Sequence, residues 1–370
     1  MIGTLVCVTR VVVLVFVMAA CAPVSTTPSV PVSSMPAVTV APSDTRIPSA
    51  VPSQNTPSRI AIADSPLPST SGAYVLFQLP GESRLRAISF GAEQSGVLSA
   101  QVPANAVWSQ SPYGAPYIVG TTSYDRDGRA LGTVPWPVDR ITWSSEGRFM
   151  CAVVPERPTT GATLRLERAF IGEAARIVAS GFGTYGDNAS QRVLACDEAA
   201  DRAVVAVFGQ GLYAGRLWVF RLSTGAIIRS VDYDARAVGR WVAASADGSL
   251  LAETEQLSAG APRTATIRSA DDGAILASLG DVIVQGFSGD NSLVVASIAG
   301  GTTVIDWKSA RRVWVNTAGS YGGFLAEPAG RRLAVGVGFV GGSDQRDVYL
   351  IAADGKALLL PTVARVDLHY

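Results

Sequence analysis

Histidine is almost absent from this chain. Its 370 residues include one histidine, His369, which lies next to the C-terminus. Because serine-protease-type triads, histidine general bases and histidine-based metal sites need an imidazole, the sequence excludes most of these chemistries. No P-loop is present, and the glycine-rich residues 181–186 lack the strand–helix context of a dinucleotide site. Carboxylate catalysis stays open in principle, although no pair of acidic residues stands out.

Charge is also sparse and balanced. Charged residues make up 16% of the chain, against about 25% in average domains, and 30 basic residues offset 30 acidic ones. The basic residues are scattered, which argues against a nucleic-acid partner. After residue 72 no amphipathic helix pattern of useful length is found, since the best candidate, residues 164–180, contains Gly172 and fits two strands equally well.

The N-terminus carries a targeting pattern. Arg10 precedes an apolar run over residues 11–20, as in a secretory signal peptide. The end of this run, with Cys21, resembles a bacterial lipobox, although Met18 stands where that family usually has leucine. The resemblance implies a signal peptide over residues 1–20, a lipid on Cys21, and an anchor outside the cytoplasm. Two alternatives remain: secretion after cleavage behind Ala22, or an uncleaved anchor, for which the run is about half of the ~20 residues needed to span.

Residues 21–71 have the composition of a tether. They hold ten of the 21 prolines in the chain, separated mainly by Ser, Thr, Val and Ala. Proline removes backbone donors, and the segment has few large apolar groups to offset the entropy of ordering. We expect a disordered tether with local polyproline II character, followed by a folded domain over residues 72–370.

Two hairpin patterns alternate along that domain. The first is a strand of small residues, a tight polar turn and an apolar strand. Its copies lie at residues 107–118, 141–151, 196–205, 241–251, 286–295 and 324–334. The second is a pair of strands joined by a tight turn that ends in glycine. Its copies lie at residues 124–131, 220–228, 267–276, 304–314 and 350–358, with Ala310 replacing the glycine in one of them.

Taken in order, the two hairpins give four strands, a to d, which recur every 34 to 55 residues or so. This period and content are typical of a propeller blade. The pattern resembles the WD40-like (YVTN-type) β-propeller repeats of bacterial extracytoplasmic proteins. The resemblance covers residues 72–370, although the Trp-Asp ending of true WD40 blades is absent.

The ends of the domain predict how the ring closes. Residues 73–90 form a further hairpin, interpreted as strands c and d, and residues 362–370 form a lone strand a. Together they would complete a blade and remove exposed sheet edges. We therefore predict an all-β fold, a single propeller of seven four-stranded blades closed by N- and C-terminal strands, with six or eight blades as the alternatives.

The loops at one end of the propeller are the candidate binding surface. The a–b and c–d turns are short, whereas the b–c and d–a loops are longer and rich in glycine. Irregular loops on a rigid frame often carry function, and tyrosine gives a large contact area at little entropy cost. The alternative is that these tyrosines only pack over the blade ends. The candidates are Arg157, Tyr185, Tyr213, Tyr321, Asp344 and Arg346.

Two cysteines remain once Cys7 and Cys21 are assigned to the N-terminal region. Cys151 and Cys196 fall at similar heights on strands of adjacent blades. An oxidising compartment would allow a disulfide between them. The alternative is a pair of small buried residues.

Two acidic turns resemble fragments of calcium loops. Residues 125–128 and 271–273 have the Asp-rich sequence, but the remaining ligands are missing and tight hairpin chemistry already explains them. We expect no metal and no cofactor.

The sequence therefore predicts a non-enzymatic binding or scaffold module at the cell envelope, with a protein or polysaccharide partner, a membrane anchor and no nucleic acid. The alternative is a propeller hydrolase or lyase that uses Asp, Tyr and Arg. A carboxylate cluster in the central channel would favour the enzyme, and an exposed aromatic patch would favour binding.

Overall fold

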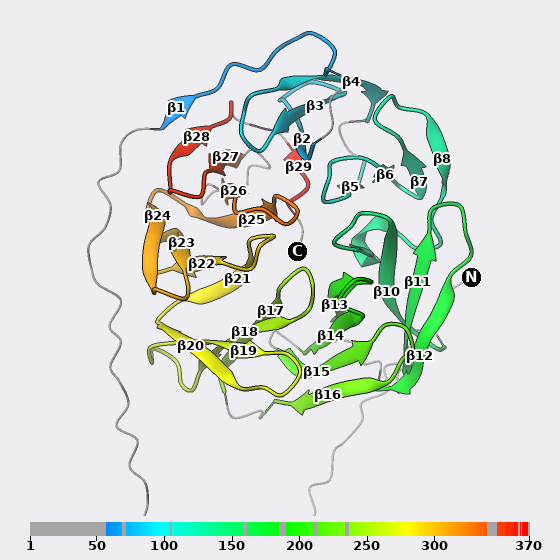
Figure 1. Cartoon of the computed structure of the whole chain (residues 1–370), viewed down its shortest axis with the longest axis vertical. Coiled ribbons are helices and arrows are strands. Elements are labelled where there is room, and N and C mark those ends of the chain that lie inside the picture. Colours follow the sequence, from blue (N-terminus) through cyan, green and yellow to red (C-terminus); the bar gives the residue numbers. More distant parts are fainter. Residues whose placement is uncertain are drawn as a thin grey trace, which may run out of the picture. The chain divides into compact units, whose positions relative to one another are not determined.

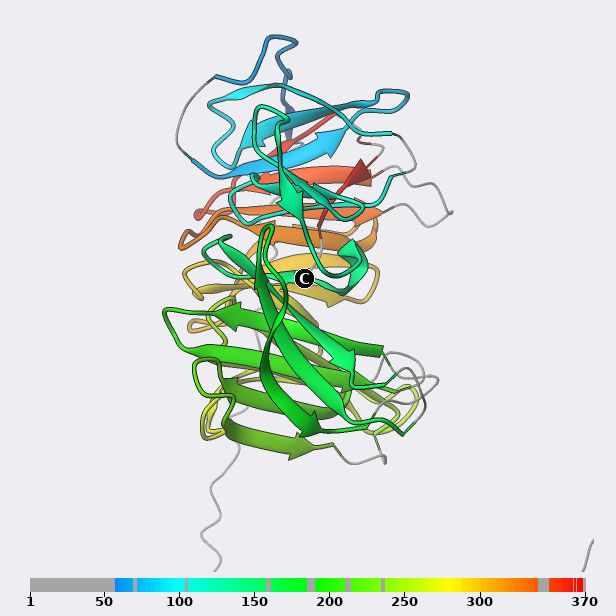
Figure 2. The same cartoon turned by 90° about the vertical axis from the view of Figure 1, so that its right-hand side faces the viewer.

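Seven sheets surround one central axis (Figure 1). The computed structural model describes residues 57–68, 72–103, 106–157, 161–184, 190–209, 214–233, 237–338, 346–361, 363 and 365–368. The predicted seven-bladed propeller is confirmed. Figure 2 shows the ring edge-on, with the blades side by side.

We number the blades by their place in the sequence, and within each blade strand a lies next to the axis. Blade 1 contains β29 (Arg365–Val366), β2 (Tyr74–Gln78), β3 (Arg84–Ser89) and β4 (Ser95–Gln101). Blade 2 contains β5 (Trp108–Gln110), β6 (Tyr117–Val119), β7 (Thr122–Tyr124) and β8 (Ala130–Thr133), and the short 3-10 helix η1 (Val138–Arg140) follows it. Blade 3 contains β9 (Thr142–Trp143), β10 (Phe149–Pro155), β11 (Leu164–Phe170) and β12 (Arg176–Phe182).

The remaining blades continue the series. Blade 4 contains β13 (Ser190–Asp197), β14 (Arg202–Phe208), β15 (Ala214–Arg221) and β16 (Ile227–Asp232). Blade 5 contains β17 (Gly239–Ala244), β18 (Leu250–Gln256), β19 (Thr264–Ser269) and β20 (Ile275–Gly280). Blade 6 contains β21 (Ile283–Phe287), β22 (Leu293–Ile298), β23 (Gly301–Asp306) and β24 (Arg311–Asn316). Blade 7 contains β25 (Ser320–Ala326), β26 (Leu333–Gly338), β27 (Arg346–Ile351) and β28 (Ala357–Leu359), with β1 (Ser58–Arg59) outside them.

The tight c–d turns follow the expected glycine chemistry. Gly225 and Gly273 adopt φ values of +70° and +76°, a left-handed backbone that costs glycine little because it has no Cβ. Ala310, which replaces the glycine in blade 6, adopts the same conformation with φ of +54°. The repeat therefore fixes the turn geometry even where the preferred residue is missing.

Blade 1 is built from both ends of the domain. β29 pairs antiparallel with β2, with Phe77 opposite Val366 and Gln78 opposite Arg365. This pairing confirms the predicted closure by N- and C-terminal strands. The hairpin at residues 73–90 supplies strands b and c rather than the expected c and d, because β4 follows it as the outer strand.

Gln110 of β5 extends the closure where β29 ends. Its Oε1 accepts a hydrogen bond from the Leu76 amide at 2.7 Å, and its Nε2 donates to the Tyr74 carbonyl at 3.0 Å. The backbone amide of Gln110 donates to Oδ2 of the buried Asp367 at 2.8 Å. A side-chain amide therefore satisfies the part of the β2 edge that the short C-terminal strand does not reach.

Residues 57–68, here called the strap, lie against the rim of the propeller rather than in the expected tether. β1 pairs in parallel with β28, and the Leu67 amide donates to the Val97 carbonyl of β4 at 3.1 Å. The buried Arg86 of β3 forms an ion pair with Asp64 at 2.8 Å. The strap thus crosses from blade 7 to blade 1, on the outside of the two blades that close the ring (Figure 1).

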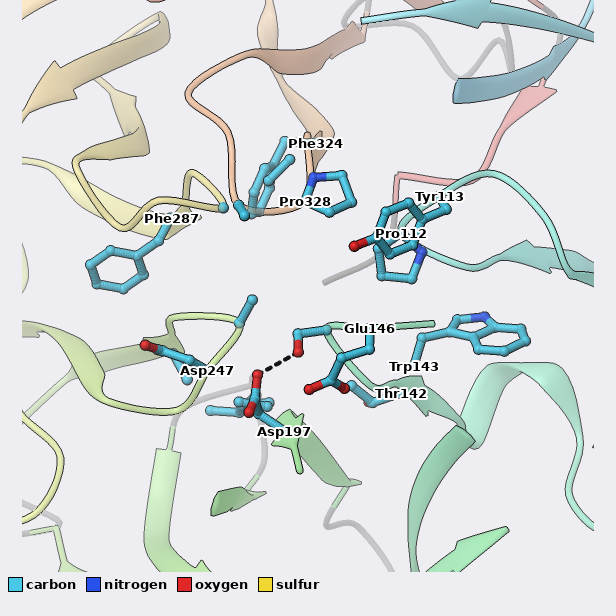
Figure 3. A pocket seen from close by; sticks show the side chains of 18 residues that line it. Pro112, Tyr113, Thr142, Trp143, Glu146, Asp197, Asp247, Phe287, Phe324 and Pro328 are labelled. Atoms are coloured by element: carbon cyan, nitrogen blue, oxygen red, sulfur yellow. Dashed lines mark hydrogen bonds between the residues drawn. The ribbon is translucent and has the colours of Figure 1, made fainter. Parts of the chain in front are cut away.

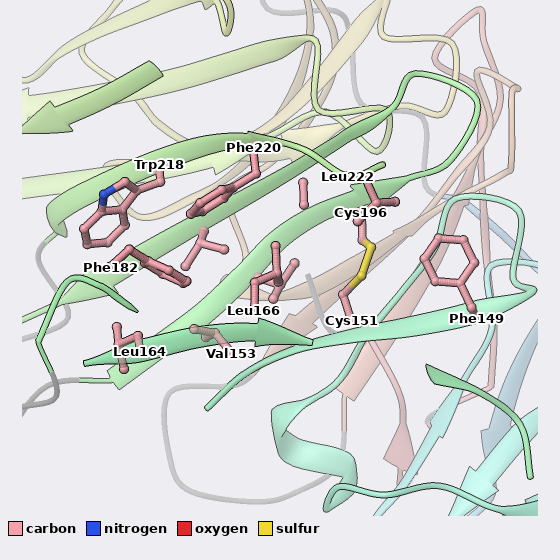
Figure 4. Packing of buried hydrophobic residues seen from close by; sticks show 13 residues of the cluster. Phe149, Cys151, Val153, Leu164, Leu166, Phe182, Cys196, Trp218, Phe220 and Leu222 are labelled. Atoms are coloured by element: carbon pink, nitrogen blue, oxygen red, sulfur yellow. A yellow bond between two sulfur atoms is a disulfide. The ribbon is translucent and has the colours of Figure 1, made fainter. Parts of the chain in front are cut away.

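Apolar side chains between neighbouring blades form the core. Between blades 3 and 4, Leu166 packs with Trp218 and Phe220 around a disulfide that joins Cys151 of β10 to Cys196 of β13 (Figure 4). Both cysteines are buried, and their Cα atoms lie 6.3 Å apart. Among the described residues, no helix has the length and apolar character of a membrane span.

Candidate functional site

The a–b turns converge on the axis and enclose a cavity at one end of the central channel (Figure 3). Its volume is about 230 Å³, and blades 2 to 7 all contribute to its lining. This end is opposite to the end with the long loops. The lining residues are Pro112, Tyr113, Thr142, Trp143, Ser145, Glu146, Leu194, Ala195, Asp197, Ala244, Ala246, Asp247, Phe287, Gly289, Phe324, Ala326, Pro328 and Ala329.

Three carboxylates gather on one side of the cavity. Glu146, Asp197 and Asp247 come from the a–b hairpins of blades 3, 4 and 5, and they lie below the centre of the cavity in Figure 3. The sequence pattern places them there because each occupies the tight polar turn of an a–b hairpin, and those turns surround the axis.

Asp247 is held by the turn that contains it. Its Oδ1 accepts hydrogen bonds from the Ser245 hydroxyl at 2.6 Å and the Ser249 amide at 3.0 Å, and its Oδ2 accepts one from Asn291 at 3.0 Å. Burial by itself would raise the pKa of this carboxyl, but the donated hydrogen bonds outweigh burial and hold the pKa below its ordinary value. Asp247 is therefore ionised at neutral pH.

Asp197 connects the turns of blades 3 and 4. Its side chain is buried and accepts hydrogen bonds from the Ser145 hydroxyl and the Ala200 amide. The dashed line in Figure 3 marks the bond to Ser145. These contacts fix the position of the carboxylate at the cavity.

Glu146 has fewer partners than the other two acids. Its Oε1 accepts one long hydrogen bond, from the Ala199 amide at 3.4 Å. Its Oε2 is buried and has no hydrogen-bond partner among the described residues. A buried polar oxygen without a partner is costly, so this carboxyl group is the one that a ligand would stabilise most.

The opposite side of the cavity is apolar. Phe287, Phe324 and Pro328 come from blades 6 and 7, and Pro112 and Tyr113 come from blade 2 (Figure 3). The two phenylalanines are buried, whereas Tyr113 is 42% exposed and forms the accessible rim. The cavity therefore has an acidic half and an aromatic half.

Among the residues that the structure describes, no basic side chain lines this cavity. Arg202 lies near Asp247 and Asp197, but its guanidinium makes two hydrogen bonds to Asp271, at 3.0 and 2.6 Å. The negative charge of the acidic half is therefore not neutralised by a cation in the lining.

The acidic turns that resemble calcium loops serve as turns. Oδ1 of Asp125 accepts the Arg129 amide at 2.8 Å, and Oδ1 of Asp272 accepts the Ala274 amide at 3.0 Å. Within the part of the chain that the structure describes, no three His, Cys, Asp or Glu side chains are grouped so that they could hold a metal ion.

Three of the predicted loop-face residues can be placed. Arg157 is exposed in the loop after β10. Tyr321 and Arg346 lie close together in blade 7, where burial raises the pKa of Tyr321 and the Arg346 guanidinium donates to the Gly322 carbonyl. These contacts favour the packing interpretation for Tyr321. The other loop-face candidates, and the predicted lipidation site, lie outside the described residues: Tyr185, Tyr213, Asp344 and Cys21.

A shallow depression lies at the loop end between blades 3 and 4. It is lined by Trp218, Tyr233, Arg216 and Asp232, among others. Arg216 forms an ion pair with Asp232 and lies over the Trp218 ring, 5.6 Å from its centroid, and the Tyr233 hydroxyl donates to Glu253 at 3.0 Å. Because these polar groups already have partners, the depression offers a ligand less than the axial cavity does.

No protein-family model matches the chain, and no curated protein matches it. Solved structures are similar to it in fold. A structure from a study of two prolyl endopeptidases superimposes with a TM-score of 0.50 at 14% identity, covering 79% of this chain and 49% of that one. This chain thus spans about half of that enzyme. The Dos1 propeller gives a TM-score of 0.42 at 13% identity, covering 83% of this chain and 86% of that one.

The β-propeller domain of Myceliophteria thermophila Cps50 (Swd1) gives a TM-score of 0.43 at 14% identity, covering 73% of this chain and 94% of that one. The seven-bladed propeller itself rests on the sheet topology and not on these similarities. At such identities they concern the fold alone.

Proposed function

We propose that this protein is a non-enzymatic binding module of the cell envelope, anchored by a lipid on Cys21 and related to the YVTN-type WD40-like propellers. The observation that carries the binding role is the axial cavity, which combines an apolar wall with a few fixed polar groups on a rigid frame. Pockets of this kind are the default binding sites of globular proteins. The partner is a protein or a polysaccharide of the envelope.

The disulfide supports the extracytoplasmic part of the proposal. Cys151 and Cys196 form a buried bridge, and such bridges persist in oxidising compartments. Mass spectrometry of the mature N-terminus tests the anchor. We expect a chain that begins at a lipid-modified Cys21, and a chain with an unmodified or absent Cys21 would refute lipidation.

The three carboxylates at the channel are also what the enzyme alternative, a hydrolase or lyase, requires. A general acid needs a raised pKa, whereas the pKa of Asp247 is lowered. Asp197 is engaged by the turns that it connects. These contacts favour a charged binding wall over an acid–base pair.

Affinity capture from the native envelope tests the binding role and its location. Ala246 is exposed in the β17–β18 turn and lines the cavity, so Ala246→Trp would fill the cavity without touching the core. A comparison variant changes three of the predicted loop-face residues: Arg157→Ala, Tyr185→Ala and Tyr213→Ala. We expect Ala246→Trp alone to abolish capture of the partner. Capture lost only with the loop variant would move the site to the loop end, and absence of any specific partner would refute the binding role.

A further inference from the structure

We infer that the axial cavity binds a cation carried on an apolar stem, and that the natural source is a lysine or arginine side chain of a partner protein. This inference rests on the proposed binding function and names the chemistry of its ligand. It concerns the end of the propeller with the short turns, which sequence patterns alone did not single out.

The charge of the lining sets the sign of the ligand. Three carboxylates face a cavity whose lining, among the described residues, contains no basic side chain, and Arg202, which lies near two of them, is paired with Asp271. An anion would meet uncompensated negative charge. A cation would gain from partly buried carboxylates, where electrostatic attraction is stronger than in bulk water.

Glu146 gives the inference a specific atom. Its buried Oε2 has no partner among the described residues, whereas Asp197 and Asp247 are hydrogen-bonded at both oxygens. A rotation of the Glu146 side chain would bring that oxygen to the cavity, where an ammonium or guanidinium group would give it a charge-assisted hydrogen bond. A hydroxyl carries no charge of its own, so it would lack the electrostatic attraction to the three carboxylates.

The aromatic half sets the shape of the ligand. Phe324 and Pro328 form an apolar wall across from the acids, Phe287 adds to the lining at the side, and Tyr113 forms the rim (Figure 3). Lysine and arginine bury their methylene stems on apolar surfaces while keeping the charged head in a polar environment. The volume of about 230 Å³ exceeds the ~150 Å³ of a cavity that accepts benzene. One long side chain fits this space, whereas a folded element does not.

The experiment compares small probes and peptides by calorimetric titration. The small probes are n-hexylamine, n-hexanol and hexanoate, which share one stem length and differ in charge. The peptides are blocked hexapeptides with one central Lys, Arg, Gln or Glu. We expect n-hexylamine to bind at least about ten times more tightly than n-hexanol, hexanoate not to bind, and the Lys or Arg peptide to bind about ten times more tightly than the Gln peptide.

The critical variant is Glu146→Gln, which removes the charge and keeps the shape. We expect it to weaken binding of n-hexylamine and of the basic peptide about tenfold. The matched control is Glu173→Gln, because Glu173 is exposed in the c–d turn of the same blade and pairs with Arg176 at 3.3 Å. This control should bind like the parent protein.

A second variant covers the case in which Glu146→Gln fails to fold. Tyr113→Ala removes a side chain that is 42% exposed, and it should weaken n-hexylamine and n-hexanol alike. Added salt should weaken n-hexylamine and leave n-hexanol unchanged.

Equal binding of n-hexylamine and n-hexanol, or of the Lys and Gln peptides, would overturn the inference. If n-hexylamine binds and neither the Lys nor the Arg peptide does, the ligand is a free amine and not a side chain of a partner protein. Neither result changes the envelope capture by the parent protein, so failure of this inference can be distinguished from failure of the proposed binding function.

Discussion

The closure of the ring can be tested by emptying the contacts of the C-terminal segment. Val363, Val366 and Leu368 are buried between blades 7 and 1, with 0%, 8% and 4% of their surface exposed. The perturbation is the triple variant Val363→Ala, Val366→Ala and Leu368→Ala. It keeps the backbone that pairs with β2 and removes only the apolar side chains.

The expected loss of stability follows from the atoms removed. Each valine loses two methyl groups, worth about 1.6 kcal/mol at ~0.8 kcal/mol per buried group. Leu368 packs against Gly336 and Gly323, which have no side chains that could fill the space it leaves. A buried Leu→Ala change that leaves a cavity costs about 2–5 kcal/mol. The sum is about 5–8 kcal/mol, a large part of the ~5–15 kcal/mol by which typical domains are stable.

Urea unfolding followed by tryptophan fluorescence measures this loss. The matched control is Ile177→Ala, Ile227→Ala and Ile275→Ala, since these isoleucines lie on outer strands and are 60%, 52% and 60% exposed. We expect the closure variant to unfold at much lower urea with a broad transition, and the control to lose about 1.5 kcal/mol or less. Equal midpoints for the two variants would refute the claim that the C-terminal contacts hold the ring together.

Three further predictions test other parts of the fold. Replacing Cys151 and Cys196 together by alanine should lower the free energy of unfolding by about 2–4 kcal/mol under oxidising conditions, because the bridge closes a loop of 45 residues, and an unchanged urea midpoint would contradict this. Hydrogen bonds outweigh burial and lower the pKa of Asp247 and Asp290 in the folded state. These two carboxylates therefore contribute stability above pH ~3.8, which is lost as the pH falls through their folded pKa values. The double variant Asp247→Asn, Asp290→Asn should reduce the acid dependence of the melting temperature below about pH 4, and a pH profile identical to that of the parent would contradict this. A chain that begins at Gly72 lacks the strap and should melt at a lower temperature than one that begins at Pro57, because the pairing with β28 and β4 is lost; equal melting temperatures would show that the strap contributes no stability.

Most of the fold can be predicted from the sequence because the turns are explicit. The six a–b hairpins fall where the repeated polar turns predict them, and the segment 164–180 forms β11 and part of β12. For the hairpin at residues 73–90 the sequence pattern predicts strands c and d, whereas the structure has strands b and c. Hairpins b–c and c–d share the same apolar–turn–apolar pattern, and β4 (SGVLSAQ) has too few large side chains to be recognised as a further strand.

Composition predicts a tether where the structure has the strap. Pro57 and Pro66 give the segment the composition of a tether, yet proline is tolerated at the edge of a sheet, where no amide is needed. The alternation of Ile60 and Ile62, which pack against the cluster between blades 7 and 1, is the signal that marks the segment as ordered. A pairing partner at the rim can only be identified once the blades are placed around the ring.

The axial carboxylates were visible in the sequence as turn residues, and that interpretation is confirmed by the hydrogen bonds of Asp247. What the sequence did not show is that Glu146 and Asp197 would face the same cavity. Their approach depends on how blades 3, 4 and 5 tilt toward the axis. An a–b turn position that recurs with acidic residues in consecutive blades is the pattern that would have predicted the cluster.

The polarity of the cavity arises from the differences between repeats. Blade 6 has the same Ser-x-Asp-x-Ser turn as blade 5, but the carboxylate of Asp290 is 3.7 Å from Arg331, and it does not line the cavity. Blades 2 and 7 place Pro112 and Pro328 at this end, where they extend the apolar wall. Uniform turns would surround the axis with a symmetric ring of charge.

Among the described residues, the acids that face the cavity come from blades 3 to 5 alone, so the charge falls on one side and leaves an apolar wall opposite. A ligand that is itself charged at one end and apolar along its length matches that asymmetry. The repeats thus build the frame, and the departures from the repeat determine what the frame can bind.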